Sequence, residues 1–286
     1  MSKDPYKAVW VSHSSIGDFL KCPRCYYLHN VYKSPKTGRK INIVSPALSL
    51  GSAVHEVIEG LALVEAEKRF AKPLLNTLEQ EWKKVSGKRG GFTSFETENE
   101  AKSRAEVMIQ RVEQNPGPLT EKTVRIKEIG GMPPNFYISE EENIILCGKI
   151  DWLVYKPHDD SVHILDFKTG KNEENEDSLQ LPIYQLLLKN LQKRKVTGAS
   201  YWYLDRDDDP TEVDLPSVED SHIKVITVAR KVKEARDRSS TEGPSEVFQC
   251  PRGALGCFSC RPFEKIIRGE AEYVGVGDMR QDLYIV

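Results

Sequence analysis

The sequence predicts a mixed α/β or α+β fold, in which a helical N-terminal part precedes a sheet, and three observations support this. The chain has 286 residues, of which 39% are hydrophobic and 29% are charged, with a formal net charge of −2. That composition is typical of a globular protein rather than of a disordered or membrane chain. Apolar residues recur at helical spacing as far as residue 114, and β-branched segments with period two follow from residue 122.

The helices are expected before residue 115. Ser14 or Ser15 is the expected N-cap of the first, whose apolar face carries Ile16, Phe19, Leu20 and Tyr27. A long helix carrying His55 is expected from Pro46 to about residue 70, followed by amphipathic helices over 74–85 and 98–114. The Pro-, Gly- and Lys-rich residues 34–46 and the Gly-rich residues 87–95 are typical of loops.

Strands are expected after the turn sequence NPGP at 115–118. The period-two segments are 122–129, 136–139, 143–155 and 161–168. A helix at 177–192 tolerates Pro182 near its first turn, and a strand at 199–204, a short strand and a helix near 227–238 follow. We therefore expect one domain over 1–286, with a helical portion at 13–115, a core at 120–205 and a cysteine-bearing segment at 245–265.

The sequence also limits the compartment and the partners. It has no apolar run of about 18 residues and no signal-peptide pattern, so we expect a cytoplasmic protein with no membrane partner. Six cysteines in that compartment are more typical of thiols or metal ligands than of disulfides. Basic clusters at 33–40 and 83–89 are typical of solvated loops, but they are also candidates for contacts with a phosphate backbone.

The most informative segment is ILCGKIDWLVYKPHDDSVHILDFK, residues 145–168. The turn residues KPHDDS predict a hairpin, and if Tyr155 opposes Val162, then Asp151 opposes Asp166. Period-two alternation places Lys168 on the same face as Asp166. Two carboxylates so close would repel unless a cation lay between them, and divalent metals prefer such oxygens. The alternative is an ordinary ion pair between Asp151 and Lys168 at the edge of a sheet.

Several motifs, taken together, resemble one nuclease family. GKID (148–151) followed by ILDFKTGK (164–171) resembles the core motif of the PD-(D/E)xK nucleases. QLPIY (180–184) and GSAVHEVIEG (51–60) are similar to the Gln-x-x-x-Tyr and histidine motifs of the RecB-like branch. FLKCPRCYYL (19–28) with CPRGALGCFSC (250–260) resembles the split cysteine motif of its iron–sulfur members, such as AddB-type and CRISPR-associated RecB-like exonucleases.

The resemblance implies a fold and a set of roles. The fold would be a restriction-endonuclease-like core, with a mixed central sheet flanked by helices, plus a helical N-terminal annex. Asp151 and Asp166 would bind Mg²⁺ or Mn²⁺, with His55 and the carbonyl group of Phe167 as further ligands. Lys168 would orient or activate the attacking water and offset charge on the phosphate. Gln180 and Tyr184, four residues apart on one helix face, would meet the metal site or the DNA.

The cysteines leave several interpretations open. The resemblance implies a four-iron, four-sulfur cluster on Cys22, Cys250, Cys257 and Cys260, with Cys25 spare. The downstream cysteines run C-x6-C-x2-C, which departs from the common family spacing of C-x2-C-x5-C. Two C-x-x-C pairs also suit zinc, and free thiols are a third alternative.

The expected function is hydrolysis of phosphodiester bonds by a metal-dependent deoxyribonuclease. The resemblance implies an exonuclease that acts on DNA ends or single strands, in DNA repair, recombination or CRISPR-type DNA processing. Its partners would be DNA and a helicase or CRISPR adaptation proteins. The alternative is a non-catalytic scaffold subunit of the same fold, which binds nucleic acid and whose fold is cross-linked by a zinc or iron–sulfur site.

Overall fold

The computed structural model describes residues 4–126 and 131–286 and groups the chain into two compact units. Unit 1 contains Met1–Val44, Asn135–Gly148 and Glu219–Val286. Unit 2 contains Ser45–Pro134 and Lys149–Val218. The chain therefore passes from one unit to the other several times, and each unit is assembled from segments that are distant in sequence.

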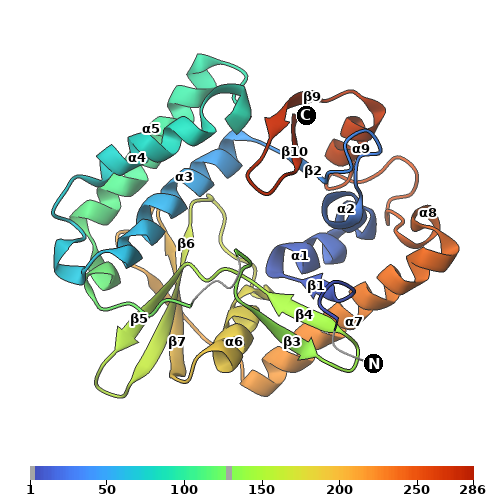
Figure 1. The fold of residues 1–286 in the computed structure, drawn as a ribbon. Coiled ribbons are helices and arrows are strands. Elements are labelled where there is room, and N and C mark those ends of the chain that lie inside the picture. The colour runs from blue at the N-terminus through green and yellow to red at the C-terminus, as the bar shows by residue number, and fades with distance from the viewer. Residues whose placement is uncertain (1–3, 127–130) are drawn as a thin grey trace. The chain divides into compact units, whose positions relative to one another are not determined.

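A four-stranded mixed sheet forms the centre of unit 2 (Figure 1). Its order is β5-β6-β7-β8, with β5 and β8 antiparallel to their neighbours and β6 parallel to β7. The strands are β5 (Trp152–Lys156), β6 (Ser161–Lys168), β7 (Lys195–Tyr203) and β8 (Thr211–Val213). Tyr155 pairs with Val162 and Leu153 with Ile164, which confirms the predicted hairpin register.

Helices pack against this sheet because β5, β6 and β7 each present a large apolar side chain to them. Trp152, Phe167 and Trp202 belong to one buried cluster with side chains of α3, α4 and α5. On α6, the side chains from Gln180 to Leu188 are all buried, and this helix lies beside β7 (Figure 1). The helices are α3 (Pro46–Gly60), α4 (Leu74–Val85), α5 (Phe95–Gln114) and α6 (Gln180–Leu191).

Polar caps explain where two of these helices begin. The Ser45 side chain accepts a hydrogen bond from the N–H group of Leu48, and Pro46 follows as the first helical residue of α3. Ser94 and Thr97 cap each other reciprocally at the start of α5. The long helix expected to reach residue 70 instead ends at Gly60, and short 3₁₀ turns at Leu61–Leu63 and Ala66–Lys68 follow.

A buried arginine ties these turns to the sheet. Arg69 is 5% exposed, and its guanidinium donates to the carbonyl oxygens of Leu61, Val64, Leu119 and Glu121 at 2.6–3.2 Å. It also lies 4.9 Å from the centre of the Trp152 ring. The side chain therefore satisfies backbone acceptors that the irregular turns leave without helical partners.

We expect Arg69→Met to lower the free energy of unfolding by about 3 kcal/mol, because it leaves buried carbonyl groups without donors. Urea denaturation followed by far-ultraviolet circular dichroism measures this change. Lys72→Met, at an exposed neighbouring position, is the control and should stay within about 0.5 kcal/mol of the wild type. Equal losses in the two variants would contradict the role given to Arg69.

Unit 1 contains two three-stranded sheets, ordered β1-β4-β3 and β2-β10-β9. Their strands are β1 (Val9–Val11), β2 (Ile41–Ile43), β3 (Asn135–Ser139), β4 (Ile144–Cys147), β9 (Glu272–Val276) and β10 (Asp282–Ile285). The helices of this unit are α1 (His13–Lys21), α2 (Pro23–Tyr26), α7 (Val218–Glu242), α8 (Pro244–Val247) and α9 (Arg261–Arg268). A π-helical turn, Tyr27–Val31, continues α2.

The first helix differs from its prediction at both ends. Its N-cap is Ser12, because Ser12 and Ser15 form a reciprocal capping box in which Ser15 is the third helical residue. The helix ends before Cys22, whose backbone is extended and which in turn caps α2. Leu20 is 57% exposed and so is not part of the apolar face.

The strand predictions were wrong in three places. The segment 143–155 is not one strand, because residues 148–151 are unpaired and separate β4 from β5. Of 122–129, the described part contributes only an isolated bridge from Thr123 to Val154, and 127–130 lie outside the described residues. Residues 34–46 were expected to be loop, yet they contain β2, which pairs with β10.

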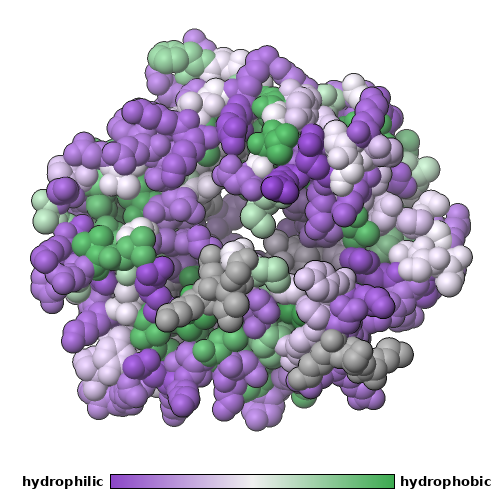
Figure 2. All heavy atoms as spheres, viewed as in Figure 1, coloured by the Kyte–Doolittle hydropathy of each residue, from purple (hydrophilic) through white to green (hydrophobic). Residues whose placement is uncertain are grey.

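The exterior agrees with the hydrophilic composition. On the face drawn in Figure 2, hydrophobic residues gather only in small patches among hydrophilic ones. Within the described ranges, no helix combines the length and apolar character needed to cross a bilayer.

Candidate active site

The predicted site residues come from four places in unit 2. His55 lies on α3, and Asp151 directly precedes β5. Asp166, Phe167 and Lys168 are the last three residues of β6. Gln180 and Tyr184 occupy the first turns of α6, four residues apart on the helix.

His55 and Asp151 meet, and a second acidic side chain joins them. The Nδ1 atom of His55 lies 3.5 Å from Asp151 Oδ2 and 3.5 Å from Glu59 Oε1. One ligand atom from each of these residues lies within 4.8 Å of the others. Asp151 Oδ2 also accepts a hydrogen bond from the N–H group of Phe167 at 3.0 Å, which fixes the carboxylate against β6.

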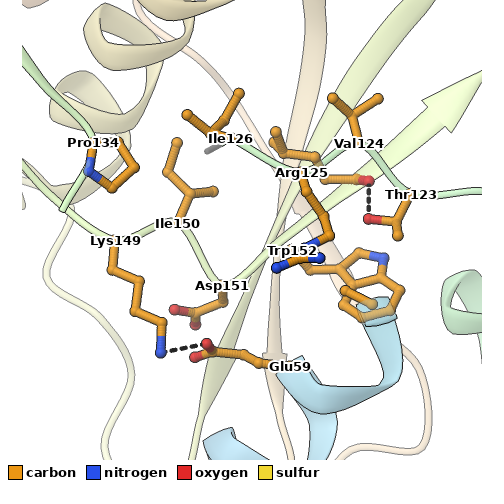
Figure 3. Close-up of a pocket in the computed structure, with 12 residues that line it drawn as sticks. Glu59, Thr123, Val124, Arg125, Ile126, Pro134, Lys149, Ile150, Asp151 and Trp152 are labelled. Carbon is orange, nitrogen blue, oxygen red and sulfur yellow. Dashed lines mark hydrogen bonds and ion pairs between the residues drawn. The ribbon is translucent and has the colours of Figure 1, made fainter. Parts of the chain in front are cut away.

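A cavity of about 490 Å³ opens beside this group (Figure 3). Glu59 and Asp151 point toward one another there, and Lys149 pairs with Glu59 at 2.5 Å. Arg125 lies on the other side of Asp151 from Lys149 in this view. The cavity thus places the carboxylates of Glu59 and Asp151 beside the cationic side chains of Lys149 and Arg125.

Asp166 is 1% exposed and is surrounded by polar groups. Its Oδ1 accepts from Gln180 Nε2 at 2.7 Å. Its Oδ2 lies 2.9 Å from Lys168 Nζ as an ion pair, but among the described residues no donor is aligned with it for a hydrogen bond. Buried oxygen atoms in proteins rarely lack such a donor. An oxygen of this kind is a suitable ligand atom for a cation.

Lys168 is held by acceptors on several sides. Its Nζ lies 2.7 Å from Glu174 Oε2 and 2.5 Å from Gln180 Oε1. Gln180 completes the network by donating to Tyr184 Oη at 3.0 Å. Gln180 therefore links Asp166, Lys168 and Tyr184, which fixes the orientation of its amide group.

The charges in this site shift several pKa values. Burial, followed by the charge of Asp166, raises the pKa of Asp151 to about 7. Burial opposes protonation of Lys168, but Asp166 and Glu174 outweigh it and raise its pKa. Burial also opposes protonation of His55, whose pKa is nevertheless raised by Glu59 and Asp151. The site thus carries an excess of negative charge that a cation would relieve.

The donor set fits a hard divalent metal. It offers carboxylate oxygens from Asp151 and Glu59, an imidazole from His55 and the buried Oδ2 of Asp166 nearby. Asp166 does not belong to the tight group of three, because its oxygens face Gln180 and Lys168. His55 therefore approaches Asp151 as predicted. Asp166 lies outside this group, but its charge still acts on Asp151 and raises the pKa of that carboxyl group.

A family model described as "PD-(D/E)XK nuclease superfamily" matches residues 10–261, most of the chain. The chain belongs to the PD-(D/E)XK nuclease superfamily. A comparison with curated proteins finds no match. The mixed sheet flanked by helices agrees with the restriction-endonuclease-like fold of this superfamily. Its members are metal-dependent nucleases, so this chain is a nuclease-type hydrolase with a nucleic-acid substrate.

Two residues of this PD-(D/E)XK site were missed by sequence reasoning. Glu59 is one turn after His55 on α3, and that spacing alone was enough to place both on one helix face. Glu174 reaches Lys168 from the loop before α6, where no periodic pattern marks it.

Unit 1 of the PD-(D/E)XK protein brings four cysteines together. One ligand atom from each of Cys22, Cys250, Cys257 and Cys260 lies within 4.8 Å of the others. Cys25 is buried nearby but is not in the group, and its N–H group donates to Cys22 Sγ at 3.5 Å. Cys147 instead donates to the carbonyl of Val11 at 3.5 Å.

The thiols of the cysteine group differ in how readily they ionise. Burial raises the pKa of Cys22 to about 11. Burial opposes ionisation of Cys257 too, but the N–H groups of Cys260 and Ser259 outweigh it and lower its pKa to about 6. Gly256 has a φ of +70°, and a Cβ atom there would lie 3.1 Å from Cys260 Sγ. Four sulfur ligands fit zinc or an iron–sulfur cluster.

The raised pKa of Asp151 predicts how the metal-free nuclease responds to pH. The folded value of about 7 exceeds the ordinary value of 3.8, so the folded state binds more protons than the unfolded state between these pH values. The contribution of this group to stability is complete below about pH 4 and is lost as pH rises through about 7.

We expect the wild type in EDTA to lose stability relative to Asp151→Asn between about pH 4 and 7. Asparagine keeps an acceptor for the Phe167 N–H group, so the two proteins differ mainly in the ionisable proton. Urea denaturation at a series of pH values checks this. Stability curves that run parallel across the whole range would contradict it.

Proposed function

We propose that the protein is a deoxyribonuclease of the RecB-like branch that uses Mg²⁺ or Mn²⁺ and degrades DNA from ends or along single strands. One observation carries the proposal: His55 on α3 and Asp151 just before β5 converge beside a buried Asp166–Lys168 pair. The context would be DNA repair, recombination or CRISPR-type DNA processing, with a helicase or CRISPR adaptation proteins as partners. The compartment would be the cytoplasm.

His55, Asp151, Asp166 and the carbonyl group of Phe167 would hold the metal, and the position of Glu59 adds it to this set. A bound Mg²⁺ or Mn²⁺ would polarise the phosphoryl oxygen and lower the pKa of a bound water. Arg125 and Lys149, which line the cavity, would attract the phosphate of the strand.

Lys168 would act as a cation rather than as a base. Its raised pKa keeps the ammonium protonated, and Asp166, Glu174 and Gln180 hold it in one place. It would donate to the scissile phosphate or orient the attacking water as negative charge develops. Gln180 and Tyr184 are positioning residues, because they act by fixing Asp166 and Lys168.

The cysteine group would hold a four-iron, four-sulfur cluster, with zinc as the alternative. Cys22 comes from the N-terminal part of unit 1, and the other three cysteines come from its C-terminal part. A bound cluster or ion would therefore tie those two parts together, and its role would be structural.

Hydrolysis of end-labelled DNA tests the proposal. We expect the wild type to degrade single-stranded or duplex DNA with Mg²⁺ or Mn²⁺ and not with EDTA. Lys168→Met should lower the single-turnover rate by about 10²–10³-fold, because the phosphate loses its charged donor. Lys189→Met, at an exposed position on α6, is the matched control and should keep the wild-type rate.

The alternative of a non-catalytic scaffold makes a different prediction. A metal-loaded wild type that binds DNA without cleaving it would favour the scaffold and contradict the nuclease proposal. Equal cleavage by the wild type and Lys168→Met would leave a nuclease whose chemistry does not use this lysine.

A further inference from the structure

Unit 1 has a second cavity, of about 380 Å³, and it collects positive charge. Lys33 and Lys40 reach it from the segment between the π-helical turn and β2, and Arg236 reaches it from α7. Trp10 and Tyr26 also line it. No carboxylate is among the described residues that form its wall.

The three cations have no acidic partner among the described residues, although most arginines of unit 1 do. Arg39 pairs with Asp282, Arg24 with Glu264 and Arg230 with Glu142, at 2.5–2.9 Å. In contrast, Arg236 contacts the hydroxyl group of Tyr26. Unit 1 therefore supplies counter-charges elsewhere, whereas no acidic residue in the described part of the chain pairs with these three cations.

The cations also lie near enough to repel one another. Burial lowers the pKa of Lys40, and the charges of Arg236 and Lys33 lower it further. A fold that gathers like charges in a concave site stores an unfavourable energy, which an anion placed among them would relieve. The cavity thus fits an anionic ligand.

The shape and the aromatic wall narrow the class of anion. Lys33 and Lys40 are exposed, Arg236 is half-buried, and together they line a cavity of the size of a small-ligand site. A single DNA strand can enter such a cavity because its backbone is flexible. Cations along the phosphates and an aromatic ring for a base are the usual elements of single-strand binding, and Trp10 supplies the ring.

We propose that this cavity is an accessory site of unit 1 that binds a phosphate-bearing nucleotide of a single DNA strand. The inference rests on the proposed function, since it takes DNA as the substrate. Lys33, Lys40 and Arg236 contact the phosphate, and Trp10 contacts the base. The site would hold the strand and take no part in the chemistry at Asp151 and Asp166.

Fluorescence anisotropy with a labelled oligothymidylate in EDTA tests the site without hydrolysis. We expect Lys33→Ala/Lys40→Ala to weaken binding by the full-length protein about tenfold and to reduce the slope of log K against log salt by about 1.4. Lys224→Ala/Lys231→Ala, which removes two exposed lysines of α7, is the matched control and should bind as the wild type does.

Two variants of Arg236 show whether its positive charge or its packing matters for binding. Arg236→Lys should keep most of the affinity and Arg236→Met should lose it, while both keep the wild-type melting temperature within a few degrees. If the lysine pair binds with unchanged affinity and salt dependence, or if the wild type does not bind the strand, the inference is overturned. Inorganic phosphate that competes as well as the oligonucleotide, mole for mole, would also overturn it.

Cleavage of the same oligonucleotide with Mn²⁺ separates this inference from the proposed function. A wild type that does not cleave, together with weakened binding in Lys33→Ala/Lys40→Ala, would end the nuclease proposal and support the site. A wild type that cleaves, together with unchanged binding in Lys33→Ala/Lys40→Ala, would support the nuclease proposal and overturn the site. If the nuclease proposal and the site are both correct, the KM of Lys33→Ala/Lys40→Ala should rise by a larger factor than its kcat falls.

Discussion

Asp166→Asn is expected to lower the single-turnover rate of DNA hydrolysis by about 10³-fold, since the buried carboxylate loses the charge that faces Lys168 and the metal site. Asparagine has nearly the same volume, so the packing around Gln180 should change little. Single-turnover cleavage at saturating Mn²⁺ and saturating enzyme measures the chemical step.

The control for this variant is Asp177→Asn, at an exposed position in the loop before α6. It removes the same charge outside the site and should leave the rate unchanged. A wild-type rate in Asp166→Asn would remove Asp166 from the chemistry. In that case the group of His55, Glu59 and Asp151 would act without Asp166, although the family motif places Asp166 beside it.

Cys260→Ser is expected to abolish metal binding in unit 1 and to lower the melting temperature by at least about 5 °C. Cys260 is fully buried, and one of its ligand atoms lies within 4.8 Å of those of Cys22, Cys250 and Cys257. Metal analysis of protein purified without oxygen, combined with calorimetry, measures both effects.

The identity of the metal follows from the same analysis. About four irons per chain with acid-labile sulfide would indicate the iron–sulfur cluster, and about one zinc would indicate a structural zinc site. Cys147→Ser, outside the group, is the control and should keep the metal. Wild-type protein that binds neither iron nor zinc would refute a metal centre at these cysteines.

The hairpin of the candidate site was predictable because its signals are local. The KPHDDS turn and the alternating apolar residues fix the pairing of β5 with β6, and the register places Asp151 and Asp166 near one another. The approach of His55 needed the packing of α3 against the sheet, which the family motif supplied and the periodicity did not. Glu174 had no signal, because its place depends on the path of a loop.

Most of unit 1 was not predictable, for a different physical reason. β1 and β2 have three residues each, too few to show a period, and their partners β4 and β10 are more than a hundred residues away in the chain. Pairing at that separation leaves no local pattern in either strand. The chemistry of the cysteines, rather than any secondary-structure signal, indicated that the two ends of the chain meet.

The interleaving of the two units sets an order for their synthesis on the ribosome. Every residue proposed for the active site, from His55 to Tyr184, is made before α7 begins at Val218. Unit 1 cannot close until β10, near residue 285, emerges to pair with β2. A nascent chain would therefore carry every proposed catalytic group before Cys250, Cys257 and Cys260 are made, so a metal bound by all four cysteines would be loaded after those groups are synthesised.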